Sequence, residues 1–250
     1  MNYYNEFNPK MAAWLRQLME DGHIPIGDVD ERSIKDVSPD DLSGYTQCHF
    51  FAGIGGWAYA LKLAGWPEDR PIWTASCPCQ PFSAPGLGLG TDDPRHLWPE
   101  FLRLKKSKFP SVAIGEQVAG EAGGGWLAGV QTDVEAMGDQ FAAADLCAAS
   151  CGAPHKRQRL FWLAYSDRNG IQRPKQQGVY LGEDRPWRSY SKEALLLANP
   201  FEPGSDWPQP LFRKMDDGLS EAVALIGGYG NAIVPQVAQA FIESVMEIID

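Results

Sequence analysis

The stretch that decides the fold is "HFFAGIGGW", residues 49–57, in which three glycines follow an apolar run. The preceding "TQCHFF" predicts a buried strand, and the following "WAYALKLAG" predicts a short helix. Glycines at 53, 55 and 56 allow a tight turn and a close approach to a ligand, beside the N–H groups of the helix N-terminus. This pattern indicates either a nucleotide-like cofactor site or a plain strand–helix turn. The third glycine of a dinucleotide fingerprint is absent, which points toward an adenosine ligand other than a nicotinamide cofactor.

Strands and helices alternate on both sides of this turn. Further helices are predicted at 9–20, 126–137 and 234–249, and further strands at 23–34, 70–76, 111–117 and 159–165. Between about 166 and 225 the periodicity is lost, and Pro, Gly, Trp, Arg and Ser dominate. The alternation predicts an α/β fold with a mostly parallel sheet and helices on both faces.

Charge and composition narrow the classes of function. The chain has 250 residues, enough for one sizeable α/β domain, and a net charge of −10. This charge argues against nonspecific electrostatic binding of nucleic acid over the whole surface, although a local basic face is compatible with it. Neither an export signal nor an apolar run of about 18 to 20 residues is visible, so we expect a cytoplasmic protein that does not cross a membrane. The five cysteines are then expected to form no structural disulfides.

Two cysteines, Cys77 and Cys79, flank a proline in "TASCPCQPFS", residues 74–83. A zinc site with Cys147 and Cys151 would need C-x-C and C-x-x-x-C spacings, which are not the usual ones. Two interpretations remain: both thiols are buried in the core, or one is a nucleophile at the carboxyl end of a strand, where open α/β sheets place their sites.

Five segments, in order, resemble the motifs of the C5-cytosine DNA methyltransferases. "PCQPFS" (78–83), followed by spaced glycines and D-x-x-R-x-L, resembles the catalytic motif. The other four are "FAGIGG" (51–56) for the S-adenosylmethionine turn, "GEQV" (115–118) for Glu-Asn-Val, "HKRQR" (155–159) for Gln-x-Arg-x-Arg and "YGNAIVP" (229–235) for the closing Gly-Asn motif. Gln117 and His155 depart from the family pattern. The resemblance covers residues 1 to about 165 and 226–250.

The resemblance implies a DNA (cytosine-5-)-methyltransferase with a Rossmann-like, class I S-adenosylmethionine-dependent fold. Cys79 would add to carbon 6 of a flipped cytosine, and Glu116 would protonate nitrogen 3. Arg157 and Arg159, which would share a face if residues 156–159 were strand, would hold Glu116, the cytosine carbonyl or the thiolate. Without the motifs, Glu116 would be read as a surface carboxylate and the arginines as a basic edge. The alternatives in function are an RNA (tRNA) cytosine-5 methyltransferase and a catalytically silent DNA-binding homologue.

The spacing of the motifs suggests a permuted order. Only 22 residues separate Gly56 from Cys79, and one βαβ crossover takes about 30. In the family, two such units between these motifs supply the acidic contacts to the cofactor's ribose and adenine, and they cannot fit here. We therefore expect both elements ahead of the glycine turn, a layout that resembles methyltransferases of phages and prophages.

The first 45 residues contain plausible copies of both elements. In "NEFNPKMAAWLRQL", Glu6 would bind the ribose hydroxyls and Phe7 would stack on adenine. In "GDVDERSI", Asp30, or with less support Asp28, would accept from the adenine amine. The competing interpretation of Glu6 is a solvated surface charge.

The remaining assignments follow from the resemblance. Further cofactor contacts are expected at Phe51, Gly53, Ile54, Gly55, Gly56, Pro78, Asn231 and Ile233, and DNA contacts at Gln80, Ser83, Arg95 and Lys156. No metal is expected. The expected division is a catalytic and cofactor-binding domain at 1–165, a small target-recognition region at 166–225 and a returning C-terminal motif and helix at 226–250. The expected partners are double-stranded DNA, S-adenosylmethionine and a cognate restriction endonuclease, for a monomer in the cytoplasm of a bacterial host.

Overall fold

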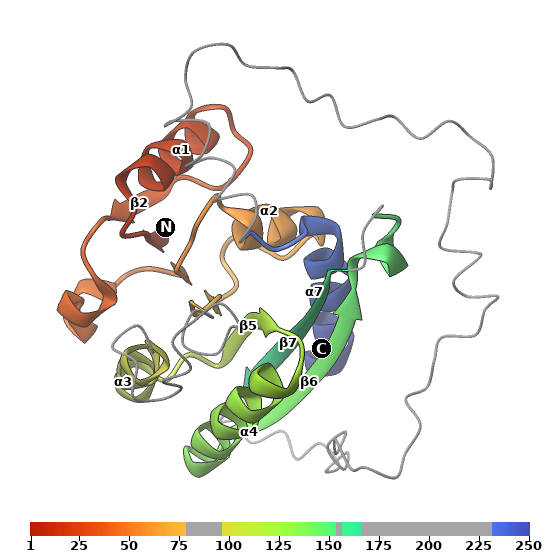
Figure 1. The fold of residues 1–250 in the computed structure, drawn as a ribbon. Helices are drawn as coiled ribbons and strands as arrows, with labels where there is room; N and C mark the ends of the chain where they lie inside the picture. Colours follow the sequence, from red (N-terminus) through yellow and green to blue (C-terminus); the bar gives the residue numbers. More distant parts are fainter. Residues whose placement is uncertain (79–96, 154–156, 167–231) are drawn as a thin grey trace, which may run out of the picture.

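A seven-stranded sheet in the order β2-β1-β3-β4-β5-β7-β6 forms the centre of the molecule (Figure 1). The computed structural model describes residues 1–78, 97–153, 157–166 and 232–250. The strands are β1 (Asn2–Asn5), β2 (Gly27–Asp30), β3 (Gln47–Phe50), β4 (Ile72–Ala75), β5 (Val112–Val118), β6 (Gln140–Cys147) and β7 (Gln158–Tyr165). Strands β1 to β5 are parallel, and β7 lies antiparallel between β5 and β6. The predicted mixed, mostly parallel α/β sheet is confirmed.

Helices cover both faces of this sheet and make a three-layer structure (Figure 1). The α-helices are α1 (Pro9–Glu20), α2 (Gly56–Leu63), α3 (Trp98–Lys108), α4 (Glu121–Ala136) and α7 (Pro235–Ile249), and the short 3-10 helices are η1 (Ile34–Asp36), η2 (Pro39–Leu42) and η4 (Ala148–Cys151). On one face, α3 and α4 pack over β3 to β7, for example where Phe101 meets Trp162. On the other face lie α1, α2 and α7, where Phe161 meets Phe241 with ring centroids 5.3 Å apart.

The first two strands lie beside the strand that leads into the glycine turn. Asn5 at the end of β1 is in register with Asp30 at the end of β2 and with Phe50 at the end of β3. The carboxyl ends of the five parallel strands therefore meet at one edge, where open α/β sheets bind their ligands. This is the placement that two units ahead of the glycine turn require.

Three elements were not anticipated from the sequence. Strand β6 reads "QFAAADLC", whose alanines have weak strand propensity. Among the strands that the structure describes, it pairs only with β7. Strand β1 has only four residues. Helix α3 begins with a proline in its first turn and has three lysines in its last turn. One of these lysines, Lys105, is fully buried in an ion pair with Asp139. Within the described ranges, no helix is long and apolar enough to span a bilayer.

Candidate functional site

The glycine turn is joined to the end of β1 by a carboxylate. Phe51, Gly53 and Gly55 all have positive φ, at 54°, 56° and 79°, so the chain reverses sharply before α2. The backbone N–H of Gly53 donates to Glu6 Oε2 at 2.7 Å, and that of Asn8 donates to Glu6 Oε1 at 2.8 Å. Because a carboxylate offers about four lone-pair sites, both oxygens can still accept from the hydroxyls of a ribose. Glu6 therefore lies where the predicted role requires, and the fixed carboxylate fits a ribose-bearing cofactor.

The ring of Phe7 is available for the predicted stacking on adenine. Phe7 is 72% exposed and lies in the short connection between β1 and α1. Exposed aromatic faces at a ligand-binding edge are suited to a flat heterocycle. The stacking itself remains a prediction.

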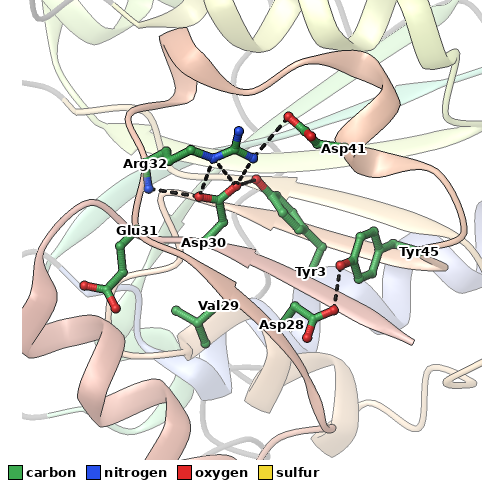
Figure 2. Close-up of a pocket in the computed structure, with 8 residues that line it drawn as sticks. All are labelled: Tyr3, Asp28, Val29, Asp30, Glu31, Arg32, Asp41 and Tyr45. Carbon is green, nitrogen blue, oxygen red and sulfur yellow. Dashed lines mark hydrogen bonds and ion pairs between the residues drawn. The ribbon is translucent and has the colours of Figure 1, made fainter.

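The predicted adenine acceptors lie in a pocket of about 380 Å³ along β2. Figure 2 shows Asp30 held by Arg32, whose backbone N, Nε and Nη2 donate to it at 2.7 to 3.1 Å, and by the Tyr3 hydroxyl at 2.8 Å. Burial alone would raise the pKa of Asp30, but these hydrogen bonds outweigh it and lower that pKa. Asp28 accepts from the Tyr45 hydroxyl at 2.6 Å through one oxygen. Both oxygens of Asp30 are thus committed within the protein, and the choice between Asp28 and Asp30 stays open.

A second, mostly apolar cavity of about 450 Å³ lies between α1, the glycine turn and the start of α7. Ile54, Gly56 and Ile233, all predicted cofactor residues, line it together with Arg157. A Cβ at Gly56 would lie 2.8 Å from Ile233 Cγ1, so this position requires glycine for close approach. Glu6 does not line this cavity, which therefore adjoins the glycine turn without including its carboxylate contact.

Glu116 combines deep burial with cationic neighbours. It lies near the end of β5 and is 6% exposed. Its Oε1 is 2.7 Å from Arg159 Nε, and the two groups form an ion pair without the alignment of a hydrogen bond. Burial raises the pKa of Glu116 to about 7, and the nearby arginines only partly oppose this. A carboxyl with this pKa is part-protonated near neutral pH, as a general acid must be.

Gly115, which precedes Glu116, allows β5 to lie close to β4 and to Trp162. A Cβ at Gly115 would lie 2.2 Å from the Ala75 carbonyl oxygen and 2.3 Å from the Trp162 ring. Glycine at 115 therefore lets β4 and Trp162 close onto β5. Glu116 therefore follows directly after the last residue pair of β4 and β5, and its carboxylate is paired with Arg159 on β7.

The two arginines do not share a face of a strand as predicted. Strand β7 begins at Gln158, and Arg157 precedes it with a φ of 35°, in the left-handed region. Its guanidinium donates to the carbonyl oxygen of Ala232, while Arg159 pairs with Glu116. The prediction of strict alternation was therefore wrong, because a turn re-aims Arg157 toward the C-terminal segment.

The cysteine segment is described only as far as Pro78. Cys77 is buried, and burial raises the pKa of its thiol well above the ordinary range, as expected for an inert packing residue. The other predicted site residues, Cys79, Gln80, Ser83, Arg95, Lys156 and Asn231, lie outside the described residues. Among the residues that the structure does describe, no group of three His, Cys, Asp or Glu side chains could hold a metal ion.

Sequence reasoning missed two contacts beside this site. One is the hydrogen bond from Arg157 to the Ala232 carbonyl, and the other runs from the indole of Trp57 to the Ser76 hydroxyl. Each joins residues from separate elements, so no local pattern signals it.

The sheet, the carboxylate-held glycine turn and the buried acid define a Rossmann-like methyltransferase. Residues 67–193, just over half of the chain, match the family described as C-5 cytosine-specific DNA methylase, and the chain belongs to this family. Its members use S-adenosylmethionine as methyl donor.

The sequence identity to individual relatives is low. The chain is 27% identical over 176 residues to the Type II methyltransferase M.HhaI of Haemophilus parahaemolyticus, covering 55% of this chain and 54% of that protein. It is 27% identical over 234 residues to M.Eco47II of Escherichia coli, covering 74% and 54%. The chain thus spans about half the length of these relatives. A crystal structure of a Spodoptera frugiperda DNMT2 mutant superposes with a TM-score of 0.47 and 17% identity, covering 71% of this chain and 45% of that one.

Proposed function

We propose that this chain transfers a methyl group from S-adenosylmethionine to carbon 5 of a flipped cytosine in double-stranded DNA. The observation that carries the proposal is Glu116, a buried carboxyl with a pKa of about 7 near the end of β5, the strand that pairs with β4. Membership of the cytosine-5 family supports the choice of base and atom.

The residues divide the chemistry between a nucleophile and an acid. The Cys79 thiolate forms a bond to carbon 6 of cytosine, and the ring electrons move toward nitrogen 3, which takes the proton of Glu116. Arg159 then stabilises the resulting Glu116 carboxylate, because the two are already paired. Bound S-adenosylmethionine would supply an electrophilic methyl group to carbon 5 and leave as S-adenosylhomocysteine. Loss of the carbon-5 proton, return of the nitrogen-3 proton to the Glu116 carboxylate and rupture of the bond from sulfur to carbon 6 restore the aromatic ring, the acid and the thiolate.

The cofactor would lie along the carboxyl edge of the sheet. Glu6 would accept hydrogen bonds from the ribose, Phe7 would cover adenine, and Asp28 or Asp30 would accept from its amine. The turn residues Phe51, Gly53, Ile54, Gly55 and Gly56, with Pro78, Asn231 and Ile233, would surround the remainder. The positions of Glu6 at Gly53 and of Ile233 at Gly56 support this arrangement.

The remaining proposals concern DNA and partners. Gln80, Ser83, Arg95 and Lys156 would contact DNA, and a target-recognition region at 166–225 would divide the catalytic part, 1–165, from the returning segment, 226–250. We infer a monomer that acts on DNA in the cytoplasm of a bacterial host, with a cognate restriction endonuclease. The Type II names of the relatives support the endonuclease partner.

Covalent trapping tests the function directly. DNA with 5-fluorocytosine, incubated with cofactor, should form a denaturation-resistant adduct with the wild type and with Cys77→Ser, but not with Cys79→Ser. Labelled methyl transfer onto DNA and onto tRNA distinguishes the proposed substrate from RNA. Transfer to tRNA alone would replace DNA as the substrate, and the absence of any adduct or transfer would indicate a silent homologue.

A further inference from the structure

Trp57 joins the glycine turn to the point where the chain leaves β4. It follows Gly56 in the first turn of α2 and is only 4% exposed. Its indole Nε1–H donates to Ser76 Oγ at 3.0 Å. Ser76 is the first residue beyond β4, which ends at Ala75. One side chain on α2 therefore holds the residue at which the cysteine segment departs from the sheet.

The same indole also contacts the strand opposite Glu116. Its ring meets Phe161 edge-on, with centroids 5.8 Å apart and an interplanar angle of 75°. Phe161 lies directly across from Glu116 in the antiparallel pairing of β5 and β7. Packing against Phe161 fixes the plane of the indole, and the fixed plane sets the direction of its N–H.

Ser76 needs such a partner because the sheet no longer holds it. The last strand pairs of β4 are Phe50 with Ala75 on one side and Ala75 with Gly115 on the other. Beyond them the chain passes through buried Cys77 to Pro78, whose ring restricts its backbone. A small rotation at Ser76 would therefore displace everything that follows, and misplacement by about 1 Å can slow catalysis by about 100-fold.

We propose that Trp57 and Ser76 form a positioning pair, which fixes the direction in which the chain leaves β4 toward Cys79. The proposal rests on the proposed function, because it assumes that this segment carries the nucleophile. Neither residue touches the reacting atoms in this role. The pair acts through the geometry of the segment, so its effect belongs to the rate of methyl transfer and not to the affinity for DNA.

Removing either half of the hydrogen bond tests the pair. Trp57→Phe keeps an aromatic ring and loses the N–H, Ser76→Ala loses the acceptor, and Ser76→Thr keeps a hydroxyl. Trp66→Phe is the matched control, because Trp66 is equally buried in the same core and donates to the Arg70 carbonyl at 3.0 Å. Single-turnover methyl transfer, KM for DNA and thermal unfolding are measured for each variant in the full chain.

The positioning role predicts a particular set of results. Trp57→Phe and Ser76→Ala should each slow single-turnover transfer by about tenfold with KM for DNA within twofold of wild type. The double variant should be no slower than the slower single variant, since both remove one interaction. Ser76→Thr should retain the wild-type rate, and Trp66→Phe should lower the unfolding temperature without slowing transfer.

Other results would overturn the pair. They are a Trp57→Phe rate within twofold of wild type, an equal loss of rate in Trp66→Phe, or losses that multiply in the double variant. A wild type that transfers no methyl group would overturn both this inference and the proposed function. An active wild type with an unslowed Trp57→Phe would overturn the positioning pair alone.

Discussion

Replacing Glu116 by glutamine should change how stability depends on pH. Burial raises the pKa of this carboxyl from an ordinary 4.5 to about 7 in the folded protein. At about 1.4 kcal/mol per pH unit, the difference corresponds to about 3 kcal/mol. The side chain is only 7% exposed, so solvent screening reduces this value little.

The direction follows from which state keeps the proton. Below pH 4.5 the carboxyl is protonated in both the folded and the unfolded chain. Between pH 4.5 and 7 only the folded state keeps the proton, so the free energy of unfolding falls as pH rises. Above pH 7 the full loss of about 3 kcal/mol is present, and Glu116→Gln lacks this dependence.

Urea unfolding at several values between pH 5 and pH 8 measures the effect. The free energy of unfolding of the wild type, relative to Glu116→Gln, should fall by about 3 kcal/mol over this range. Glu247→Gln, an exposed change on α7, controls for the loss of one negative charge. A relative free energy that stays constant within about 0.5 kcal/mol, or that rises with pH, would refute the reasoning. Such a result would mean that Arg159 outweighs burial.

Three further changes test other parts of the site and core. Glu6→Ala removes a carboxylate that accepts from the backbone N–H groups of Asn8 and Gly53. Calorimetry should then show about tenfold weaker binding of S-adenosylmethionine, and an unchanged affinity would contradict the assignment of Glu6. Gly56→Ala places a Cβ 2.8 Å from Ile233 Cγ1 and should cost about 1 to 3 kcal/mol in urea unfolding, but much less when it is made in an Ile233→Ala background; an equal cost in both backgrounds would contradict the steric cause. Lys105→Met leaves Asp139 buried without its cationic partner. The free energy of unfolding in denaturant should fall by about 3 to 5 kcal/mol, and the double variant with Asp139→Leu should regain most of this loss. A loss below about 1 kcal/mol would contradict the pairing.

The sequence predicted the elements whose signals are local. Helix α1 has the predicted bounds of residues 9–20, because Pro9 in its first turn and the apolar spacing are written within the helix itself. The position of Glu6 was also predictable, since the 22 residues between Gly56 and Cys79 leave no room for the cofactor units elsewhere.

The contacts that depend on tertiary structure were not predictable in the same way. The alternation of residues 157 and 159 assumed that Arg157 lies in the strand, whereas β7 begins at Gln158. The left-handed turn at Arg157 comes with a contact to Ala232, 75 residues away. The alanines of β6 carry little strand preference, so its pairing with β7 is what holds it in the sheet. For Asp30, the sequence predicted an acceptor for the adenine amine but not the hydrogen bonds that Arg32, two residues later, donates to it.

The position of β7 has a consequence for synthesis of the chain. Strands β1 to β5 can each join the growing sheet soon after emerging from the ribosome, but the outer edge of β5 pairs with β7 and not with the earlier β6. The backbone groups of that edge of β5 therefore remain unpaired until residue 165 has been synthesised. Strand β6 cannot join the sheet before then, because it pairs with β7. An unpaired strand edge recruits other chains. A polypeptide that stops after β6 should therefore aggregate, although it contains all but one of the strands that the structure describes.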